Sequence, residues 1–356
     1  MADISQFSPW KILYYRNEIE SLLEGTIPPP ICLSIDPTNI CNQNCIWCFV
    51  KPYRTKNPVS LSRDELANFI DEIRGKVPAI TYSGGGDPLV NLATIDTIAY
   101  ASRDFEQGLT TNGTPPIPES ALDIISDNCS FVRVSIDAAT PKTYNRIHKS
   151  PLFGKAFRFV RELVKRRKCG HEVNVSFMIC PLNLDEVVSA TELFYGLGGV
   201  DKIIFKFAYS NYPGINPGFS TDAFITKNKE KIIGIIDKVK AKETKYFKVL
   251  FRHPEVFNKM KIVHQSELYN NCIVAPLNQA GLAADGNIHL CCDRRGDLIL
   301  GNIKQQKFFG MWGSERHKRM MRDIVVAKCP TRCRATDMNR IVEVGFIKEE
   351  LDWTML

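Results

Sequence analysis

The chain has 356 residues, 44% of them hydrophobic, and a formal net charge of +7, which fits one large domain with a smaller one, or two domains. Twelve cysteines without a secretory signal indicate reduced thiolates in a cytoplasmic protein and argue against a disulfide framework, and no apolar run is long enough to span a membrane. The positive charge permits an anionic substrate, but ordinary surface lysines explain it as well. The sequence has no basic stripe with interleaved aromatic residues of the kind that binds nucleic acid.

The first expected element is an amphipathic helix over residues 10–24, ended by Gly25 and the prolines that follow. Strands and helices then alternate. The expected strands are residues 31–35, 79–83, 107–111, 131–136, 172–180 and 202–207, and the expected helices are residues 62–73, 92–101, 151–168 and 185–195. This alternation predicts a parallel α/β sheet with right-handed crossovers and a site at the carboxyl ends of the strands.

Three cysteines follow the first of these strands at the spacing C-x3-C-x2-C: Cys41, Cys45 and Cys48. Three thiolates on one short loop can hold three irons of a [4Fe–4S] cube and leave the fourth iron open to a ligand. A zinc knuckle is the alternative, but structural zinc takes four protein ligands and this loop contains no histidine. The spacing therefore favours an iron–sulfur cluster.

Other polar and glycine-rich segments also come directly after expected strands. Residues 84–87 are three glycines and an aspartate, Asn112 follows the next strand, and Asp137 follows the one after that. Because the carboxyl ends of parallel strands meet at one edge, these segments and the cysteine loop are expected to share one mouth. Glycines allow a backbone to approach a bound molecule closely, although a tight turn explains them as well.

The C-terminal part holds a second set of cysteines. Residues 214–218 are a loop-rich candidate boundary, a helix is expected over about residues 226–240, and a β-hairpin arm over residues 286–292. The candidate ligands of a second, fully ligated cube are Cys272, Cys291, Cys329 and Cys333. Structural zinc on the same four thiolates is the alternative. Cys292 is expected to be spare, because neighbouring residues of a strand point to opposite faces.

The cysteine loop, with Trp47 just before its last cysteine, resembles that of the radical S-adenosylmethionine (SAM) enzymes. Residues 83–88 resemble the Gly-Gly-Glu-Pro element of that family, with Asp87 in place of the glutamate. The resemblance implies two [4Fe–4S] clusters and SAM as cofactors. It implies cofactor binding by Trp47, Gly84, Gly85, Gly86, Asp87, Asn112, Ser135, Asp137 and Arg146. His148 is the second choice for the place of Arg146, where many relatives have an arginine for the cofactor carboxylate.

The C-terminal cysteines resemble the auxiliary-cluster domains called SPASM and twitch. Five cysteines support one cluster, which favours the shorter twitch type. The expected fold is thus a partial (β/α)6 TIM-like barrel with a small C-terminal iron–sulfur domain. The expected domains are an N-terminal helical extension (1–28), the radical SAM partial barrel (29–225) and the auxiliary-cluster domain (226–356).

The resemblance implies an enzyme that reductively cleaves SAM to a 5′-deoxyadenosyl radical and abstracts hydrogen from its substrate. The auxiliary cluster would help to complete an oxidation, epimerisation or rearrangement. A polar small molecule is favoured as substrate (a sugar, aminocyclitol or nucleotide-linked metabolite), because about 40 residues precede the cysteines of the first cluster and a leader-binding domain takes about 80. A peptide- or protein-modifying maturase and a non-catalytic iron–sulfur or zinc scaffold are the alternatives. Flavodoxin or ferredoxin is the expected reducing partner.

No catalytic side chain is assigned by the sequence. Cys180 and Cys292 are candidate hydrogen-atom donors. Lys206 is expected either to face the barrel interior and meet an acidic substrate or to bury its stem with its charge at the surface. The histidines show no recognisable spacing to a carboxylate and are interpreted as surface or core residues.

Overall fold

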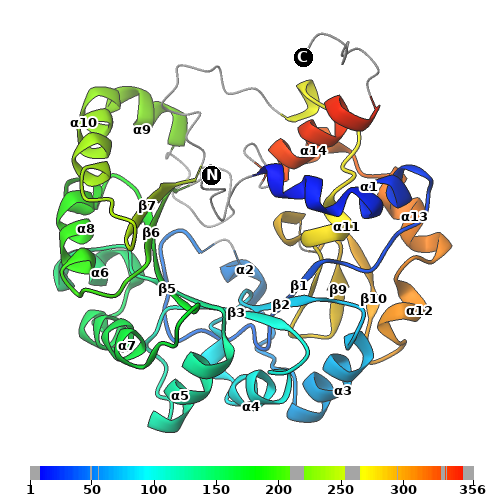
Figure 1. Ribbon diagram of the computed structural model, residues 1–356, viewed down its shortest axis with the longest axis horizontal. Coiled ribbons are helices and arrows are strands. Elements are labelled where there is room, and N and C mark those ends of the chain that lie inside the picture. Colours follow the sequence, from blue (N-terminus) through cyan, green and yellow to red (C-terminus); the bar gives the residue numbers. More distant parts are fainter. Residues whose placement is uncertain are drawn as a thin grey trace.

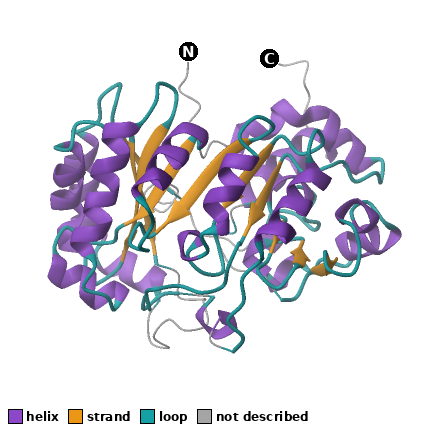
Figure 2. Ribbon diagram, turned by 90° about the horizontal axis from the view of Figure 1, so that it is seen from below, coloured by secondary structure: helices purple, strands orange, loops and turns teal. Residues whose placement is uncertain are grey.

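The computed structural model describes residues 9–48, 50–54, 56–208, 220–252, 265–294, 296–329, 333 and 335–347. Within this part of the chain, ten strands form one sheet in the order β10-β9-β8-β1-β2-β3-β4-β5-β6-β7. The sheet curves into an open horseshoe, with helices along its outer face (Figure 1). The same arrangement from below shows the strands inside a layer of helices (Figure 2).

Seven consecutive strands of the sheet are parallel. They are β1 (Cys32–Ile35), β2 (Ala79–Tyr82), β3 (Glu106–Thr111), β4 (Phe131–Ser135), β5 (Glu172–Ile179), β6 (Lys202–Phe207) and β7 (Lys248–Phe251). The helices between them are α2 (Lys51–Arg54), α3 (Arg63–Ile73), α4 (Ala93–Tyr100), α5 (Glu119–Asn128), α6 (Pro141–His148), α7 (Phe153–Arg166), α8 (Val187–Tyr195), α9 (Thr221–Lys227) and α10 (Lys229–Lys240). The predicted partial barrel is confirmed, and β7 extends it by one strand.

Side chains along each strand point alternately to the two faces of the sheet, so one face can form the core and the other can form the site. In β1, Leu33 and Ile35 are fully buried and belong to the main hydrophobic core. Ser34, between them, points to the other face, where its hydroxyl lies 2.9 Å from that of Ser83 after β2. The outer face of the sheet therefore packs on the helices, and polar side chains are left for the inner face.

The C-terminal part of the chain returns to the first strand. β8 (Gly281–Leu282) pairs in parallel with β1, and β9 (Asn287–His289) pairs antiparallel with both β8 and β10 (Ile299–Asn302). The remaining helices of this part are α11 (Ala275–Asn278), α12 (Phe308–Met311), α13 (Glu315–Arg322) and α14 (Thr336–Val342). The N-terminal η1 (Pro9–Tyr15) and α1 (Arg16–Leu23) lie beside α14 (Figure 1).

All six expected strands are confirmed, with shifts of about one residue at their ends. The helix expected from residue 62 is α3, and its first turn has a capping box in which the Ser62 hydroxyl accepts from Glu65 N and the Glu65 carboxylate accepts from Ser62 N. The helix expected over about residues 226–240 is confirmed as α10, which begins at Lys229, and the separate helix α9 before it was missed. Strand β7 and helices α5 and α6 were missed.

The candidate boundary at residues 214–218 lies outside the described residues. The predicted division after residue 225 falls within α9 and stays a prediction. In the part of the chain that the structure describes, no helix is both long enough and apolar enough to cross a membrane.

Candidate active site

The cysteine loop lies directly after β1. Cys41, Cys45 and Cys48 are half-buried, and Cys48 N donates to Cys45 O at 3.2 Å. Burial raises the pKa of the Cys45 thiol well above its usual value, and negative charge on Asp137, Cys41 and Cys48 raises it further. The three predicted ligands are therefore close enough to one another to interact electrostatically.

The triple glycine holds the cysteine loop by close backbone contact. A side chain on Gly84, whose φ is +116°, would overlap the Asp36 carboxylate, and one on Gly86 would overlap the Ile40 carbonyl oxygen. Asp87 N donates to that same carbonyl at 2.9 Å. In this structure the glycines bring the end of β2 against the chain that leads into Cys41.

Asp87 is buried and its carboxylate joins two strand ends. It accepts hydrogen bonds from Asn112 N at 2.6 Å, Leu89 N at 3.0 Å and the Thr111 hydroxyl at 2.9 Å. Burial raises the pKa of Asp87 to about 6, against the lowering effect of these donors. Its carboxylate thus fixes the loop after β2 to the end of β3.

Asn112 reaches from β3 to the cysteine loop. Its Nδ2 donates to Asn42 Oδ1 at 2.9 Å and lies 3.7 Å from Cys41 Sγ. Within the loop, Gln43 Nε2 donates to the Tyr144 hydroxyl of α6 at 2.7 Å and to the Thr114 hydroxyl after β3 at 3.2 Å. The loop is therefore held from β3 on one side and from α6 on the other.

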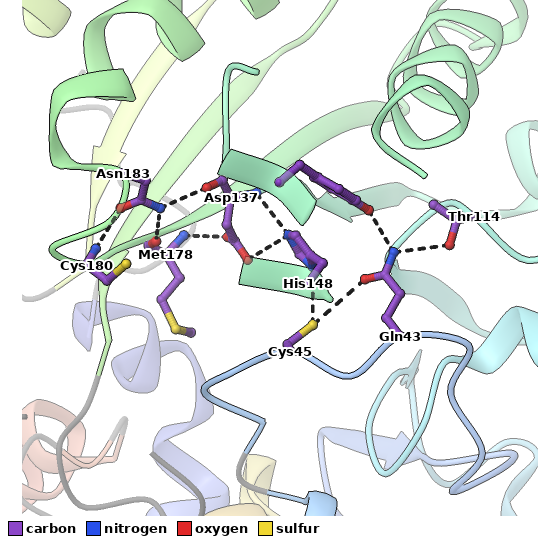
Figure 3. A network of polar contacts seen from close by, with 9 residues as sticks. Gln43, Cys45, Thr114, Asp137, His148, Met178, Cys180 and Asn183 are labelled. Atoms are coloured by element: carbon purple, nitrogen blue, oxygen red, sulfur yellow. Dashed lines mark hydrogen bonds and ion pairs between the residues drawn. The ribbon is translucent and has the colours of Figure 1, made fainter. Parts of the chain in front are cut away.

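Asp137 and His148 connect the end of β4 to the same loop. His148 Nδ1 lies 3.2 Å from Cys45 Sγ, and His148 Nε2 lies 3.3 Å from Asp137 Oδ2 (Figure 3). Both side chains are buried; burial raises the pKa of Asp137 to about 7 and lowers the pKa of His148 to about 3. The predicted mouth therefore includes a buried aspartate, a histidine and a cysteine in contact.

The interpretation of the histidines as surface or satisfied core residues fits the buried His148, but its contacts with Asp137 and Cys45 were not predicted. The pair is separated by 11 residues, and no local spacing rule finds it, because α6 must fold back over β4 to form it. Arg146 is exposed on the same helix, with its charge acting on Cys180. Ser135 is half-buried at the end of β4, opposite Ser176 of β5. The cofactor roles of Arg146 and Ser135 stay predictions.

Trp47 lies in a small apolar cluster beside the loop. It packs with Ile147, Cys180 and Ala208, and Met178 contacts the same cluster. Burial raises the pKa of the Cys180 thiol to about 11, which keeps the thiol protonated at neutral pH. Cys180 is thus a buried S–H group near the loop, as a hydrogen donor would be, and its role stays a prediction.

Three of the four predicted auxiliary ligands gather in the C-terminal part. The charges of Cys272 and Cys329 both raise the pKa of Cys333, after the larger effects of burial and Asp293. Asn339 Nδ2 donates to Cys272 Sγ at 3.3 Å. Burial raises the pKa of the Cys329 thiol, and the charge of Arg294 and a hydrogen bond from it lower that pKa. Polar side chains therefore surround these sulfurs.

Cys291 and Cys292 differ in their surroundings, but neither lies in a strand as expected, because β9 ends at His289 and a 3-10 helix begins at Cys292. Cys291 is buried, whereas the Cys292 thiol lies 3.4 Å from Gln279 Oε1. Cys292 also lines a small cavity together with Ser34, Asp36, Gly281, Leu282, Ala283 and His289. Cys292 thus faces the start of the barrel, and the choice of Cys291 as the fourth ligand stays a prediction.

The two sets of thiols are the predicted ligands of the two clusters. Among the described residues, which include all seven predicted ligands, no three His, Cys, Asp or Glu side chains are arranged to hold one metal ion. Structural zinc needs four donors around one ion. A cube takes each thiolate on a different iron, so its ligands stand farther apart, and bound iron deprotonates thiols that burial keeps neutral.

Two family models match the chain, in the same order as the two sites. Residues 35–194 match the radical SAM superfamily. Residues 272–335 match SPASM, an iron-sulfur cluster-binding domain. The chain belongs to the radical SAM superfamily.

This radical SAM protein is an enzyme, and its cofactors are [4Fe–4S] clusters and SAM. It is 24% identical to the AdoMet-dependent heme synthase of Methanosarcina barkeri over 83% of this chain and 85% of that protein. It is 28% identical to the mycofactocin maturase MftC of Mycobacterium ulcerans over 39% of this chain, an alignment that spans only 38% of that protein.

The radical SAM fold is also found in solved structures. Streptococcus suis SuiB bound to its precursor peptide SuiA has a TM-score of 0.65 and 14% sequence identity, covering 90% of this chain and 73% of that one. At this identity the likeness concerns the fold alone.

Proposed function

We propose that this radical SAM enzyme acts on a polar small molecule held at the carboxyl ends of the barrel strands. The observation that carries the proposal is the polar inner face of the sheet. Ser34 and Ser83 are hydrogen-bonded there, and the positive charge of Lys206 acts on Asp137 near the cysteine loop. Such a face suits a hydrogen-bonding or acidic substrate better than an apolar one.

The alignment with the heme synthase supports the same proposal. The alignment covers more than four fifths of both chains, and the name of that relative denotes the synthesis of a small molecule. A peptide or protein substrate is the second candidate, and the similarity to the mycofactocin maturase favours it, over a shorter alignment. A cytoplasmic location and reduction by a flavodoxin or ferredoxin remain part of this proposal.

The residues have the following roles in the proposal. Cys41, Cys45 and Cys48 hold the cluster that binds SAM, and residues 84–87 shape the backbone beside it. When bound, the cluster and SAM supply one-electron cleavage of a carbon–sulfur bond, and thereby a species that abstracts hydrogen. The chain itself orients the cofactor and the substrate and excludes competing reactions.

The activity is tested on protein whose clusters have been reconstituted anaerobically. Dithionite and SAM are added, and 5′-deoxyadenosine is measured by mass spectrometry. Formation of 5′-deoxyadenosine that the triple Cys→Ala variant at positions 41, 45 and 48 abolishes supports the cluster assignment. Unchanged formation in that variant would refute it.

The substrate class is tested with a cell extract that stimulates 5′-deoxyadenosine formation. Stimulation by the low-molecular-mass fraction that survives protease treatment supports a small molecule. Stimulation that the protease removes supports the peptide candidate instead. The two outcomes are distinct from the first test, which concerns the cofactors alone.

A further inference from the structure

His148 bridges the cysteine loop and the end of β4. Besides its contact with Cys45, its Nε2 lies 3.4 Å from Asp137 N, which can donate to it, and 3.3 Å from Asp137 Oδ2. The ring stacks on Tyr144, with ring centroids 4.1 Å apart. Packing therefore sets the ring plane, with one nitrogen towards the cysteine sulfur and the other towards the aspartate (Figure 3).

The hydrogen-bond donors around the His148 ring determine which of its nitrogens carries the proton, and thus whether an N–H group faces Cys45. A thiolate that ligates iron can only accept a hydrogen bond. The backbone N–H of Asp137 can only donate, so when it donates to Nε2 the proton of a neutral ring is on Nδ1. If Nε2–H donated to the Asp137 carboxylate instead, a proton on Nδ1 as well would make the ring a cation. The neutral ring with its proton on Nδ1 is therefore the form that places an N–H group against Cys45 Sγ.

Asp137 is itself held in place from β5 and the loop after it. Its Oδ1 accepts from Met178 N at 2.6 Å, and its carbonyl oxygen accepts from Asn183 Nδ2 at 2.8 Å. Asn183 Oδ1 in turn accepts from Cys180 N at 2.7 Å. This chain of contacts fixes the aspartate, which fixes the histidine against the cysteine sulfur (Figure 3).

We propose that His148 donates a hydrogen bond from Nδ1–H to the sulfur of Cys45 and thereby raises the reduction potential of the cluster on the cysteine loop. A hydrogen bond to a ligand sulfur stabilises the more negative, reduced cluster. Asn112 Nδ2, at 3.7 Å from Cys41 Sγ, is a longer contact. His148 is therefore a positioning and tuning residue that acts through Cys45. The inference rests on the proposed cluster site.

The test compares two replacements of similar volume. His148→Asn keeps an N–H donor near the position of Nδ1, and His148→Leu removes it. His171→Leu is the control, because His171 precedes β5, at the opposite end of the strand from the cysteine loop, and bonds to Ser126 O. Iron content and the midpoint potential of the loop cluster are measured without SAM, by redox titration followed by electron paramagnetic resonance, in a background where Cys272, Cys329 and Cys333 are alanine.

We expect His148→Leu to lower the equilibrium constant for cluster reduction about tenfold, which is about 59 mV for a one-electron couple. His148→Asn and His171→Leu are expected to stay near the parent value. Equal potentials in the Leu and Asn variants would overturn the proposal. If His148→Leu loses iron while His148→Asn keeps it, the result also supports the proposal, because only the N–H donor differs between the two variants. Equal iron loss in both variants would overturn the proposal. A parent protein that binds no iron would instead refute the proposed cluster site.

Discussion

Gly86 shows how one residue without a side chain allows the site to form. Its Cα lies so close to the Ile40 carbonyl that a Cβ would overlap the oxygen, and the contact is backbone, which cannot rotate away. The sequence indicated only a tight turn or a close approach to a ligand. The structure adds that the close approach is to the protein's own cysteine loop.

We expect Gly86→Ala to lower the free energy of unfolding by about 1–3 kcal/mol, the usual cost of overpacking, and to reduce iron per chain. The measurements are urea unfolding and iron analysis after reconstitution. Gly154→Ala in α7 is the matched control, because a Cβ there meets nothing within 4 Å. That control should gain ~0.5–1 kcal/mol. Equal stability of the two variants would contradict the contact.

At the scale of elements, α12 and α13 attach the C-terminal part to the barrel. Phe308 of α12 packs edge-on against Phe69 of α3, and Trp312 Nε1 donates to Pro28 O at 2.8 Å. His317 of α13 lies against Trp312, with ring centroids 4.5 Å apart. An aromatic cluster thus joins segments that are far apart in the sequence.

His317 makes this attachment sensitive to acid. Its Nδ1 accepts from Gly313 N at 3.1 Å, its Nε2 has no hydrogen-bond partner among the described residues, and burial lowers its pKa to about 4. An unfolded histidine titrates near pH 6.5, so between about pH 6.5 and pH 4 the unfolded state binds the extra proton. The contribution of neutral His317 to stability is complete above that range and is lost as the pH falls through it.

We therefore expect the free energy of unfolding to fall on acidification below about pH 6.5, with a slope from this group of at most ~1.4 kcal/mol per pH unit. His317→Asn keeps an acceptor for Gly313 N but has no titrating group. Urea unfolding of the parent and the variant at a series of pH values measures the difference. The variant should be less pH-dependent; parallel curves would mean that His317 does not titrate on unfolding.

At the scale of the whole molecule, one sheet connects the two sets of cysteines. β8 pairs with β1, whose end leads into the cysteine loop, and the cavity that contains Asp36 also contains Cys292, the neighbour of Cys291. The predicted auxiliary ligand Cys291 is therefore next in sequence to a residue that lies beside the first strand of the barrel.

We expect the alanine variants of Cys272, Cys291, Cys329 and Cys333 to lose the iron and sulfide of one cluster, and Cys292→Ala to keep them. Iron and sulfide counting on single variants measures this. Loss in Cys292→Ala but not in Cys291→Ala would reverse the assignment of these two neighbours. If the cluster is an electron relay, its removal should spare formation of 5′-deoxyadenosine and stop product formation.

The sequence by itself determined the periodic and local features. The six strands, the ligand spacing of Cys41, Cys45 and Cys48, and the glycines after β2 are each encoded within about ten neighbouring residues, where alternation, capping and turn chemistry act. Because parallel strands end at one edge, these local signals were enough to predict a common mouth.

Only the tertiary structure decided contacts between distant segments. His148 meets Cys45 across 103 positions, and Trp312 meets Pro28 across 284. The seventh strand β7 depends likewise on its pairing with β6. A local pattern does not encode these contacts, because their free energy comes from burying side chains that the chain brings together only when it folds.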